Sequence, residues 1–162
     1  MKLGEGVEWS IHCCTILAAL PRGVVISGQK LAEFHDVPAP YLVKQLQKLS
    51  QAGIVETTTG RKGGYRLARP ASEISLLEVV LALEGNERAF RCTEIRRKGP
   101  SKVGGVKYPL PCGISAAMWR AEQAWRNELA QTNIAEIATH AASEIDPRQM
   151  AKAIAWFQEV LS

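Results

Sequence analysis

The chain has 162 residues, 20 Lys+Arg against 16 Asp+Glu, a formal net charge of +4 and four cysteines. Its 46% hydrophobic content excludes a disordered or collagenous chain, and four cysteines are too few for a disulfide scaffold. No apolar run approaches the about 20 residues that a membrane span requires, so we expect a cytoplasmic protein without a membrane partner.

The first expected element is a helix over residues 5–20. Val7, Ile11 and Cys14 recur at helical spacing and form one apolar stripe. Cys13 and Cys14 are adjacent beside this stripe, and we expect both to pack in the core, because reduced cysteine is among the most buried residue types.

A helix-turn-helix is expected next. Ser27 is a suitable N-cap for a short second helix, which directs Leu31 and Phe34 inward, and Pro40 opens a third helix at its first turn. Two helices joined by so short a turn are typical of this motif.

The third helix carries polar residues that recur at i, i+3, i+4 and i+7. These candidate DNA contacts are Tyr41, Lys44, Gln45 and Lys48. Lys and Gln side chains reach phosphates and base edges in a major groove, and Tyr bonds a phosphate oxygen. The alternative is an ordinary solvated helix face.

A β-hairpin with a cationic tip follows the third helix. The first strand begins at Ile54, a glycine-rich turn spans 60–64, and the chain alternates back before Pro70. Arg61 and Lys62 at the tip are suited to a minor groove or to phosphate. The order of elements predicts a winged helix-turn-helix that binds double-stranded DNA.

Three runs of residues in this region carry a family pattern. They are Tyr41-Leu42-x-x-x-Leu46-x-x-Leu49-x-x-Ala52-Gly53-Ile54-Val55, Gly60-x-x-Gly63-Gly64-Tyr65-x-Leu67-Ala68 and Ile74-Ser75-Leu76-Leu77-Glu78-Val79-Val80. The chain resembles the Rrf-two winged-helix regulators, which include IscR, NsrR and RsrR. The resemblance spans residues 1 to about 130 and implies a dimeric bacterial transcription factor. Thr59 stands where IscR-like members have an arginine.

Cys92 and Cys112 bracket a segment without helical or strand periodicity, which is usually functional or disordered. Two thiolates cannot complete the four protein ligands of a 2Fe-2S cluster, and a zinc site has the same shortage. Glu8 and His12 are the candidate further donors, since they share a helix face at i and i+4. The alternative for that pair is an ordinary ion pair or hydrogen bond along the helix.

The resemblance gives this ligand set a context. RsrR-like members combine a Glu and a His on the first helix of one subunit with two cysteines in the loop of the other. The chain shares their patterns Gly6-Val7-Glu8-Trp9, His12-Cys13-Cys14 and Phe90-x-Cys92-Thr93-Glu94-Ile95-Arg96. The three-cysteine members IscR and NsrR do not match. The resemblance therefore implies a 2Fe-2S cluster held by Cys92 and Cys112 of one chain and by Glu8 and His12 of its partner.

A long helix over residues 113–131 keeps helical spacing over about 28 Å. Its apolar positions are Ile114, Ala117, Met118, Ala121, Ala124, Trp125 and Leu129. We expect it to pair two subunits about a two-fold axis. The tail offers Ile134, Ile137 and Ala141, and after Asp146-Pro147 a last packing helix with Met150, Ala153, Ile154, Phe157 and Leu161.

The sequence thus predicts a mainly α fold with a small β-wing, divided into a winged helix-turn-helix domain (1–85), a cluster-binding loop (86–112) and a dimerisation helix with C-terminal helices (113–162). The expected function is a homodimeric repressor that is not an enzyme and whose DNA affinity follows the redox state or presence of its cluster. One alternative is a cluster-free regulator that senses thiol oxidation or a small ligand. Another is an iron-sulfur electron-transfer protein.

Overall fold

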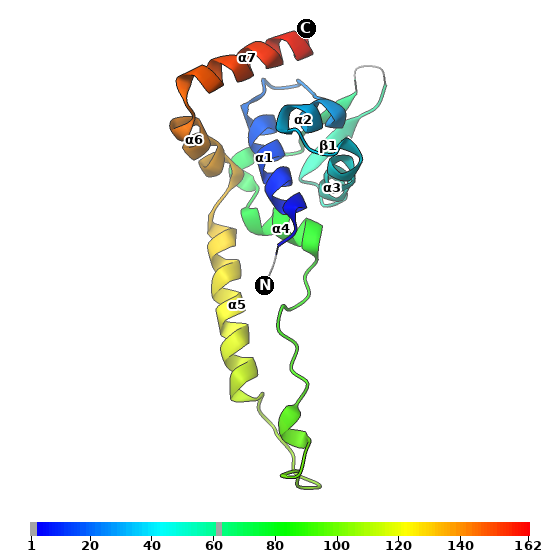
Figure 1. The fold of residues 1–162 in the computed structure, drawn as a ribbon, viewed down its shortest axis with the longest axis vertical. Coiled ribbons are helices and arrows are strands. Elements are labelled where there is room, and N and C mark those ends of the chain that lie inside the picture. Colours follow the sequence, from blue (N-terminus) through cyan, green and yellow to red (C-terminus); the bar gives the residue numbers. More distant parts are fainter. Residues whose placement is uncertain (1–2, 61–62) are drawn as a thin grey trace.

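The computed structural model describes residues 3–60 and 63–162 and shows a winged-helix half from which a long arm extends (Figure 1). Its helices are α1 (Glu5–Ala19), α2 (Gly28–His35), α3 (Ala39–Gln51), α4 (Leu76–Glu84), α5 (Gly113–Gln131), α6 (Ile134–Glu144) and α7 (Pro147–Leu161). The strands are β1 (Val55–Thr58) and β2 (Gly64–Leu67), and short 3-10 helices lie at Ala71–Glu73 and Ile95–Arg97. The mainly α fold with a small β-wing is confirmed.

The helix-turn-helix forms where local signals place it. The Ser27 hydroxyl accepts a hydrogen bond from the Lys30 N–H at 3.2 Å and caps α2. Asp36 ends α2 in a left-handed conformation, and Pro40 lies in the first turn of α3. Leu31 is fully buried as expected, whereas Phe34 is half-buried.

The wing is a two-stranded antiparallel sheet whose register runs from Val55 opposite Leu67 to Thr58 opposite Gly64. Ile26 adds a further antiparallel bridge to Tyr65. Gly64 is required at this crossing, because a Cβ there would lie 2.6 Å from the Ile26 carbonyl oxygen. Two residues of the predicted wing tip, Arg61 and Lys62, lie outside the described residues.

Cys13 and Cys14 lie in the core of the winged helix, and both are 0% exposed. Burial raises the pKa of each thiol to about 12, with the neighbouring Cys13 adding to the effect on Cys14. The two thiols therefore stay protonated at neutral pH and act as small apolar groups, as the sequence predicts.

The core also includes a residue from the C-terminal part of the chain. Leu76 N–H donates to the Thr132 carbonyl at 2.9 Å, and Ile134 N–H donates to the Ile74 carbonyl at 2.9 Å. Ile134 is 0% exposed. Helices after residue 113 therefore contact the winged helix: α6 packs on α1, and α5 contacts α4.

The arm consists of residues 86–112 and α5, which run side by side away from the winged-helix half (Figure 1). Ala89 N–H donates to Glu122 at 3.2 Å, and the Trp119 indole N–H donates to the Phe90 carbonyl at 3.3 Å. Arg126 contacts Asn86 at 2.5 Å. These bonds attach residues 86–90, which lead from α4 toward Cys92, to α5.

The last helix, α7, packs on α2 through aromatic side chains. Asp146 accepts a hydrogen bond from Arg148 N–H at 2.8 Å and caps the helix. Trp156 and Phe157 lie 5.1 and 4.8 Å from the Phe34 ring. The predicted packing positions Ile154 and Leu161 are wrong, because these side chains are 51% and 37% exposed. The two aromatic residues, with Val160, take their place against the core.

None of the helices in the described part of the chain is both long and apolar enough to cross a bilayer.

Candidate DNA interface and metal-binding residues

The outer surface of α3 carries two of the predicted DNA contacts. Lys44 is exposed, and Tyr41 is 46% exposed with its ring edge against Trp9, 5.4 Å between centroids. Both residues lie in the first half of α3. This part of the helix can therefore offer a cation and a hydroxyl to a phosphate backbone.

The prediction that four polar residues share one solvent-facing surface is wrong for Gln45. This side chain is 6% exposed and fills space beside Gly6, where a Cβ would lie 3.0 Å from the Gln45 Cδ. The missing side chain of Gly6 makes room for the amide under α1. Gln45 therefore cannot reach a base edge in this conformation.

Lys48 is also turned inward. Its ammonium donates to the Leu83 carbonyl at 3.0 Å, in the last turn of α4, where a cation complements the helix dipole. Lys48 thus joins α3 to α4 and is placed to support the helix rather than to contact DNA.

Arg66 of β2 and Arg69, which follows that strand, form ion pairs within the winged-helix half. Arg66 contacts Glu56 across the sheet at 2.6 Å, and Arg69 contacts Glu78 at 2.5 Å. Their positive charge is therefore partly compensated, which lowers the positive electrostatic potential of this surface.

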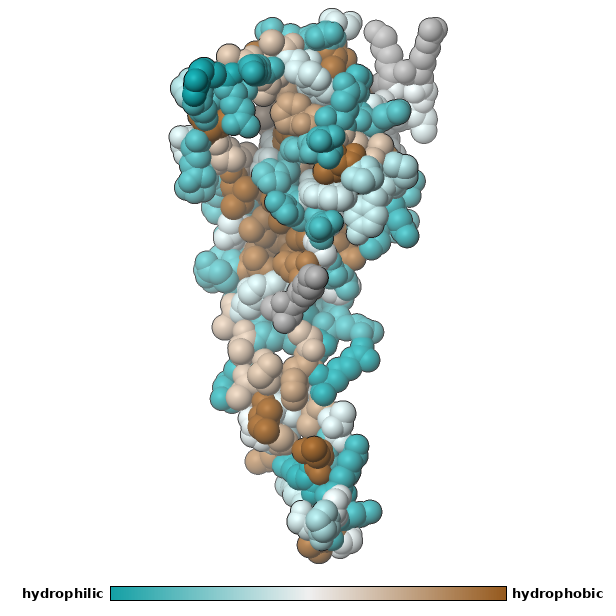
Figure 2. Space-filling view, in the orientation of Figure 1, coloured by the Kyte–Doolittle hydropathy of each residue, from teal (hydrophilic) through white to brown (hydrophobic). Residues whose placement is uncertain are grey.

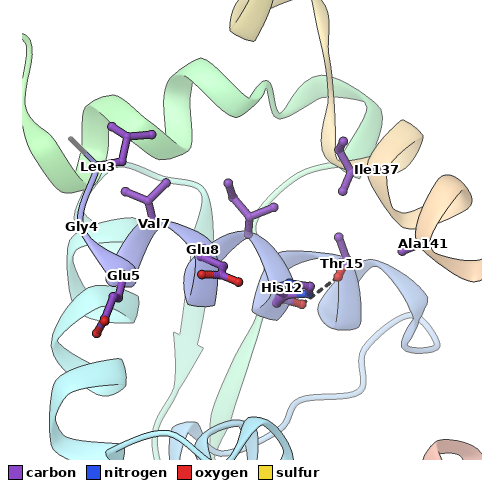
Figure 3. Close-up of a pocket in the computed structure, with 10 residues that line it drawn as sticks. Leu3, Gly4, Glu5, Val7, Glu8, His12, Thr15, Ile137 and Ala141 are labelled. Atoms are coloured by element: carbon purple, nitrogen blue, oxygen red, sulfur yellow. Dashed lines mark hydrogen bonds between the residues drawn. The ribbon is translucent and has the colours of Figure 1, made fainter. Parts of the chain in front are cut away.

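Glu8 and His12 lie side by side on the exposed face of α1, as Figure 3 shows. They line an open pocket of about 480 Å³ whose other walls include Ile11 and, from α6, Ile137 and Ala141. In the described part of the chain no hydrogen bond or ion pair joins the two side chains. The expected alternative of a helical ion pair is not formed, and both groups face outward.

Cys112 lies at the N-cap of α5, at the far end of the arm. The backbone N–H groups of Ser115 and Ile114, followed by the charge of Arg96, lower the pKa of its thiol. Backbone N–H groups at the start of an α-helix stabilise a thiolate in this way.

Cys92 is half-buried at the other end of the segment. Its sulfur accepts a hydrogen bond from the Glu94 N–H at 3.4 Å, and its thiol lies 3.7 Å from the Glu94 carboxylate. Glu94 in turn pairs with Arg96, the residue whose charge acts on Cys112. Both cysteines therefore adjoin one Glu94–Arg96 pair.

One chain does not bring all four predicted ligands together. The start of α5 lies at the opposite end of the arm from α1 (Figure 1). Over residues 3–60 and 63–162, no three His, Cys, Asp or Glu side chains form a group that could hold a metal ion. Each pair supplies two donors of types that suit iron, an imidazole with a carboxylate and two thiols.

Sequence reasoning missed the residues that hold the arm together. Glu122 and Arg126 contact each other at 2.8 Å and also bind residues 86–89. Their i, i+4 spacing was a usable signal. Arg96 entered only as part of a family pattern, because its contacts with Tyr108 and Leu110 are distant in sequence.

The comparisons with known proteins agree with this architecture. The sequence model of the Rrf2 family, described as iron-dependent transcriptional regulator, matches residues 3–140. The chain belongs to the Rrf2 family. It is a DNA-binding transcription regulator and not an enzyme. This assignment favours the regulator over the electron-transfer alternative.

Relatives and solved structures support the Rrf2 assignment. The chain is 30% identical over 145 residues to the HTH-type transcriptional regulator Rv1287 of Mycobacterium tuberculosis, covering 89% of this chain and 85% of the relative. The oxidised form of Staphylococcus aureus CymR superposes with a TM-score of 0.62 at 26% identity, covering 85% and 96% of the two chains. T. potens IscR superposes with a TM-score of 0.65 at 19% identity, covering 93% and 96%, which shows the shared fold.

Proposed function

We propose that this Rrf2 regulator is a homodimeric repressor whose DNA affinity is set by the redox state or presence of a 2Fe-2S cluster, as in RsrR-like members. The observation that carries the proposal is the division of donors. Glu8 and His12 face outward from α1, and Cys92 and Cys112 adjoin one ion pair at the end of the arm. Each place holds half of a four-ligand set.

Exposed apolar surface on the arm supports the dimer. Ile114 is 65% exposed and Met118 46% exposed along one stripe of α5, and Figure 2 shows apolar side chains uncovered along the arm. A soluble protein rarely leaves such a stripe open to water unless another chain covers it. Two-fold pairing through α5 would carry the arm of one chain toward α1 of its partner.

The proposed ligands have distinct tasks. Cys92 and Cys112 supply thiolates, and the lowered thiol pKa of Cys112 favours its metal-binding form. Glu8 and His12 supply a carboxylate and a neutral imidazole. When bound, the cluster would provide a one-electron redox centre whose potential depends on this mixed ligand set.

DNA recognition is assigned to Tyr41 and Lys44 on α3 together with Arg61 and Lys62 of the wing. Tyr41 and Lys44 are exposed on α3, and a wing beside such a helix is suited to phosphate or minor-groove contact. A change at the cluster would alter the relative positions of the two winged helices. A coupling free energy of about 1–3 kcal/mol between the cluster state and DNA binding would change operator affinity by roughly 5- to 150-fold.

A mixed dimer provides the decisive test. One chain carries Glu8→Ala and His12→Ala, the other carries Cys92→Ala and Cys112→Ala, and the two are co-expressed with different affinity tags and purified without oxygen. Neither homodimer should hold iron or absorb visible light. The heterodimer should hold one cluster, because one complete ligand set remains between the chains. A colourless heterodimer beside a coloured wild-type dimer would refute ligation across the chains, and a colourless wild-type dimer would refute the cluster itself.

A cluster-free thiol sensor is the second candidate, and Cys112 favours it. The lowered pKa of this thiol favours its thiolate, the form that oxidants attack. Oxidant-treated metal-free protein that gains mass at Cys112 and loses operator affinity, with both effects abolished by Cys112→Ser, would support the thiol sensor over the cluster.

A further inference from the structure

Arg96 connects the two ends of the segment between the cysteines. Its Nη2 donates to the Leu110 carbonyl at 2.9 Å, and its guanidinium lies 4.2 Å from the centre of the Tyr108 ring. On the other side it forms a two-point contact with Glu94, with distances of 2.9 and 3.2 Å. One guanidinium therefore ties residues 94–96 to residues 108–110.

The same side chain contacts both of the segments that carry the cysteines. Its partner Glu94 contacts Cys92 through the backbone N–H and through the carboxylate. The chain that Arg96 holds at Leu110 continues directly to Cys112, whose thiol is within reach of the Arg96 charge. The contacts of Arg96 therefore determine how close the two cysteine-bearing segments lie to each other.

We propose that Arg96 is a positioning residue that holds residues 94–96 and residues 108–110 of the arm together, so that Cys92 and Cys112 face one metal group. The metal group rests on the proposed function, whereas the tie between the strands stands on the contacts alone. The role needs arginine, because only a planar fork can bind a carboxylate at two points, donate to a carbonyl and stack on an aromatic ring together.

Arg97 provides a matched control on the same turn. It is also near Glu94, at 3.6 Å, but its side chain is 54% exposed against 31% for Arg96. Among the described residues, the hydrogen bond to Leu110 comes from Arg96. Arg97 also lies over the Tyr108 ring, but at 5.5 Å against 4.2 Å for Arg96. Removal of either charge changes the net charge equally, whereas removal of Arg96 also removes the hydrogen bond to Leu110 and the two-point contact with Glu94.

Hydrogen exchange of the full-length, iron-free dimer tests directly whether Arg96 holds the two segments of the arm together. In Arg96→Gln we expect the hydrogen-bonded amides of Lys98 and Lys102, which donate to the Ile95 and Gly99 carbonyls, to exchange about tenfold faster than in wild type. This factor corresponds to the loss of about one charge-assisted hydrogen bond. Arg97→Gln should exchange as wild type does, and Arg96→Lys should resemble Arg96→Gln. Equal exchange in wild type and Arg96→Gln would overturn the proposal.

The visible absorption and electron paramagnetic resonance spectra of the anaerobically reconstituted protein test the link to the metal group. We expect Arg96→Gln to lose iron or to show altered spectra, while Arg97→Gln keeps the wild-type spectra. Unchanged spectra and iron content in Arg96→Gln would overturn the positioning role even if exchange increases. A wild-type protein that takes up no cluster would refute the proposed function and the metal-facing role, leaving the exchange result to decide the tie between the strands.

Discussion

The polar side chains of α3 differ in what their surroundings leave them free to do. Lys44 is exposed, whereas the Lys48 ammonium is held by the Leu83 carbonyl and the Gln45 amide lies under α1. A cation that already complements the end of α4 gains little by leaving it for a phosphate. Direct contact with DNA is therefore expected from Lys44 but not from Lys48.

Substitution of these two lysines separates the two roles. In Lys44→Met the slope of log K against log salt concentration for operator binding should fall by about 1, because one phosphate contact is lost. In Lys48→Met the slope should stay as in wild type, and urea unfolding should show a loss of about 1–2 kcal/mol from the missing bond to Leu83. Equal decreases of the slope in both variants would contradict the inward placement of Lys48.

Gly64 is a second residue whose role follows from its immediate neighbours. Gly64→Ala places a methyl group 2.6 Å from the Ile26 carbonyl oxygen, so the wing must shift away from the core. We expect a loss of about 1–3 kcal/mol in the free energy of unfolding. The control is Gly104→Ala, where nothing lies within 4 Å of the new Cβ. Chemical denaturation that gives the same stability for both variants would show that the strand crossing tolerates a side chain.

Elements of this chain are joined by a few specific contacts, and α7 is the clearest case. It lies beyond residues 3–140, the region that the family model matches, yet Trp156 and Phe157 stack on Phe34 of the helix-turn-helix. Lys30 of α2 also lies over the Trp156 ring, at 5.9 Å. The C-terminal helix therefore packs on α2, although it lies beyond the residues that the family model matches.

Trp156→Ala tests whether α7 stabilises α2 through these contacts. Loss of the stacked ring should lower stability by about 1–2 kcal/mol, since aromatic pairs contribute beyond their buried area. Ile154→Ala on the same helix removes a side chain that is 51% exposed and should change stability by less than about 0.5 kcal/mol. Thermal unfolding followed by circular dichroism measures both. Greater destabilisation by Ile154→Ala would mean that the other face of α7 is the packed one.

Local signals in the sequence were enough to predict the elements but not all of their faces. Ser27 caps α2 as expected, Asp146 caps α7, and Gly53, with φ of 69°, follows the end of α3. The orientation of Gln45 could not be predicted, because it depends on Gly6, a residue on another helix that leaves space for it. Helical periodicity identifies a polar stripe but does not reveal which neighbour covers it.

The candidate metal residues were predictable only in pairs. Glu8 and His12 follow from i, i+4 spacing, and the two arm cysteines follow from the segment that they bracket. The contacts of Arg96 with Tyr108 and Leu110 depend on the path of a segment without periodicity. Such a path is decided by side-chain contacts that no local pattern encodes.

The whole molecule has two unlike parts, a packed winged helix and an arm that exposes apolar surface. Besides Ile114 and Met118 of α5, the arm segment exposes Ile95, Val103 and Leu110, which are 73%, 68% and 75% exposed. This surface is expected to be covered in the dimer.

Met118→Glu tests whether a second chain covers the exposed apolar stripe of α5. A carboxylate there would be desolvated in the dimer, so we expect the dimer to dissociate at micromolar concentration, as sedimentation velocity would detect. Asn127→Glu, on another exposed face of α5, adds the same charge and should leave the dimer intact. Dissociation by Asn127→Glu with no effect of Met118→Glu would place the interface on the other side of the helix.

The arm leaves the core after α4 and rejoins it at Ile134, where Leu76 and Thr132 are hydrogen-bonded at the start of α4. The two points of attachment are thus separated by about the length of α4, whose nine residues span about 13 Å. About five extended residues can cross that distance. The arm is therefore an insertion between two nearby points of the winged helix, although Trp125 and Leu129 of α5 also pack against the core. A chain in which a short linker replaces residues 86–131 should fold as a monomeric DNA-binding module that is less stable than the full chain.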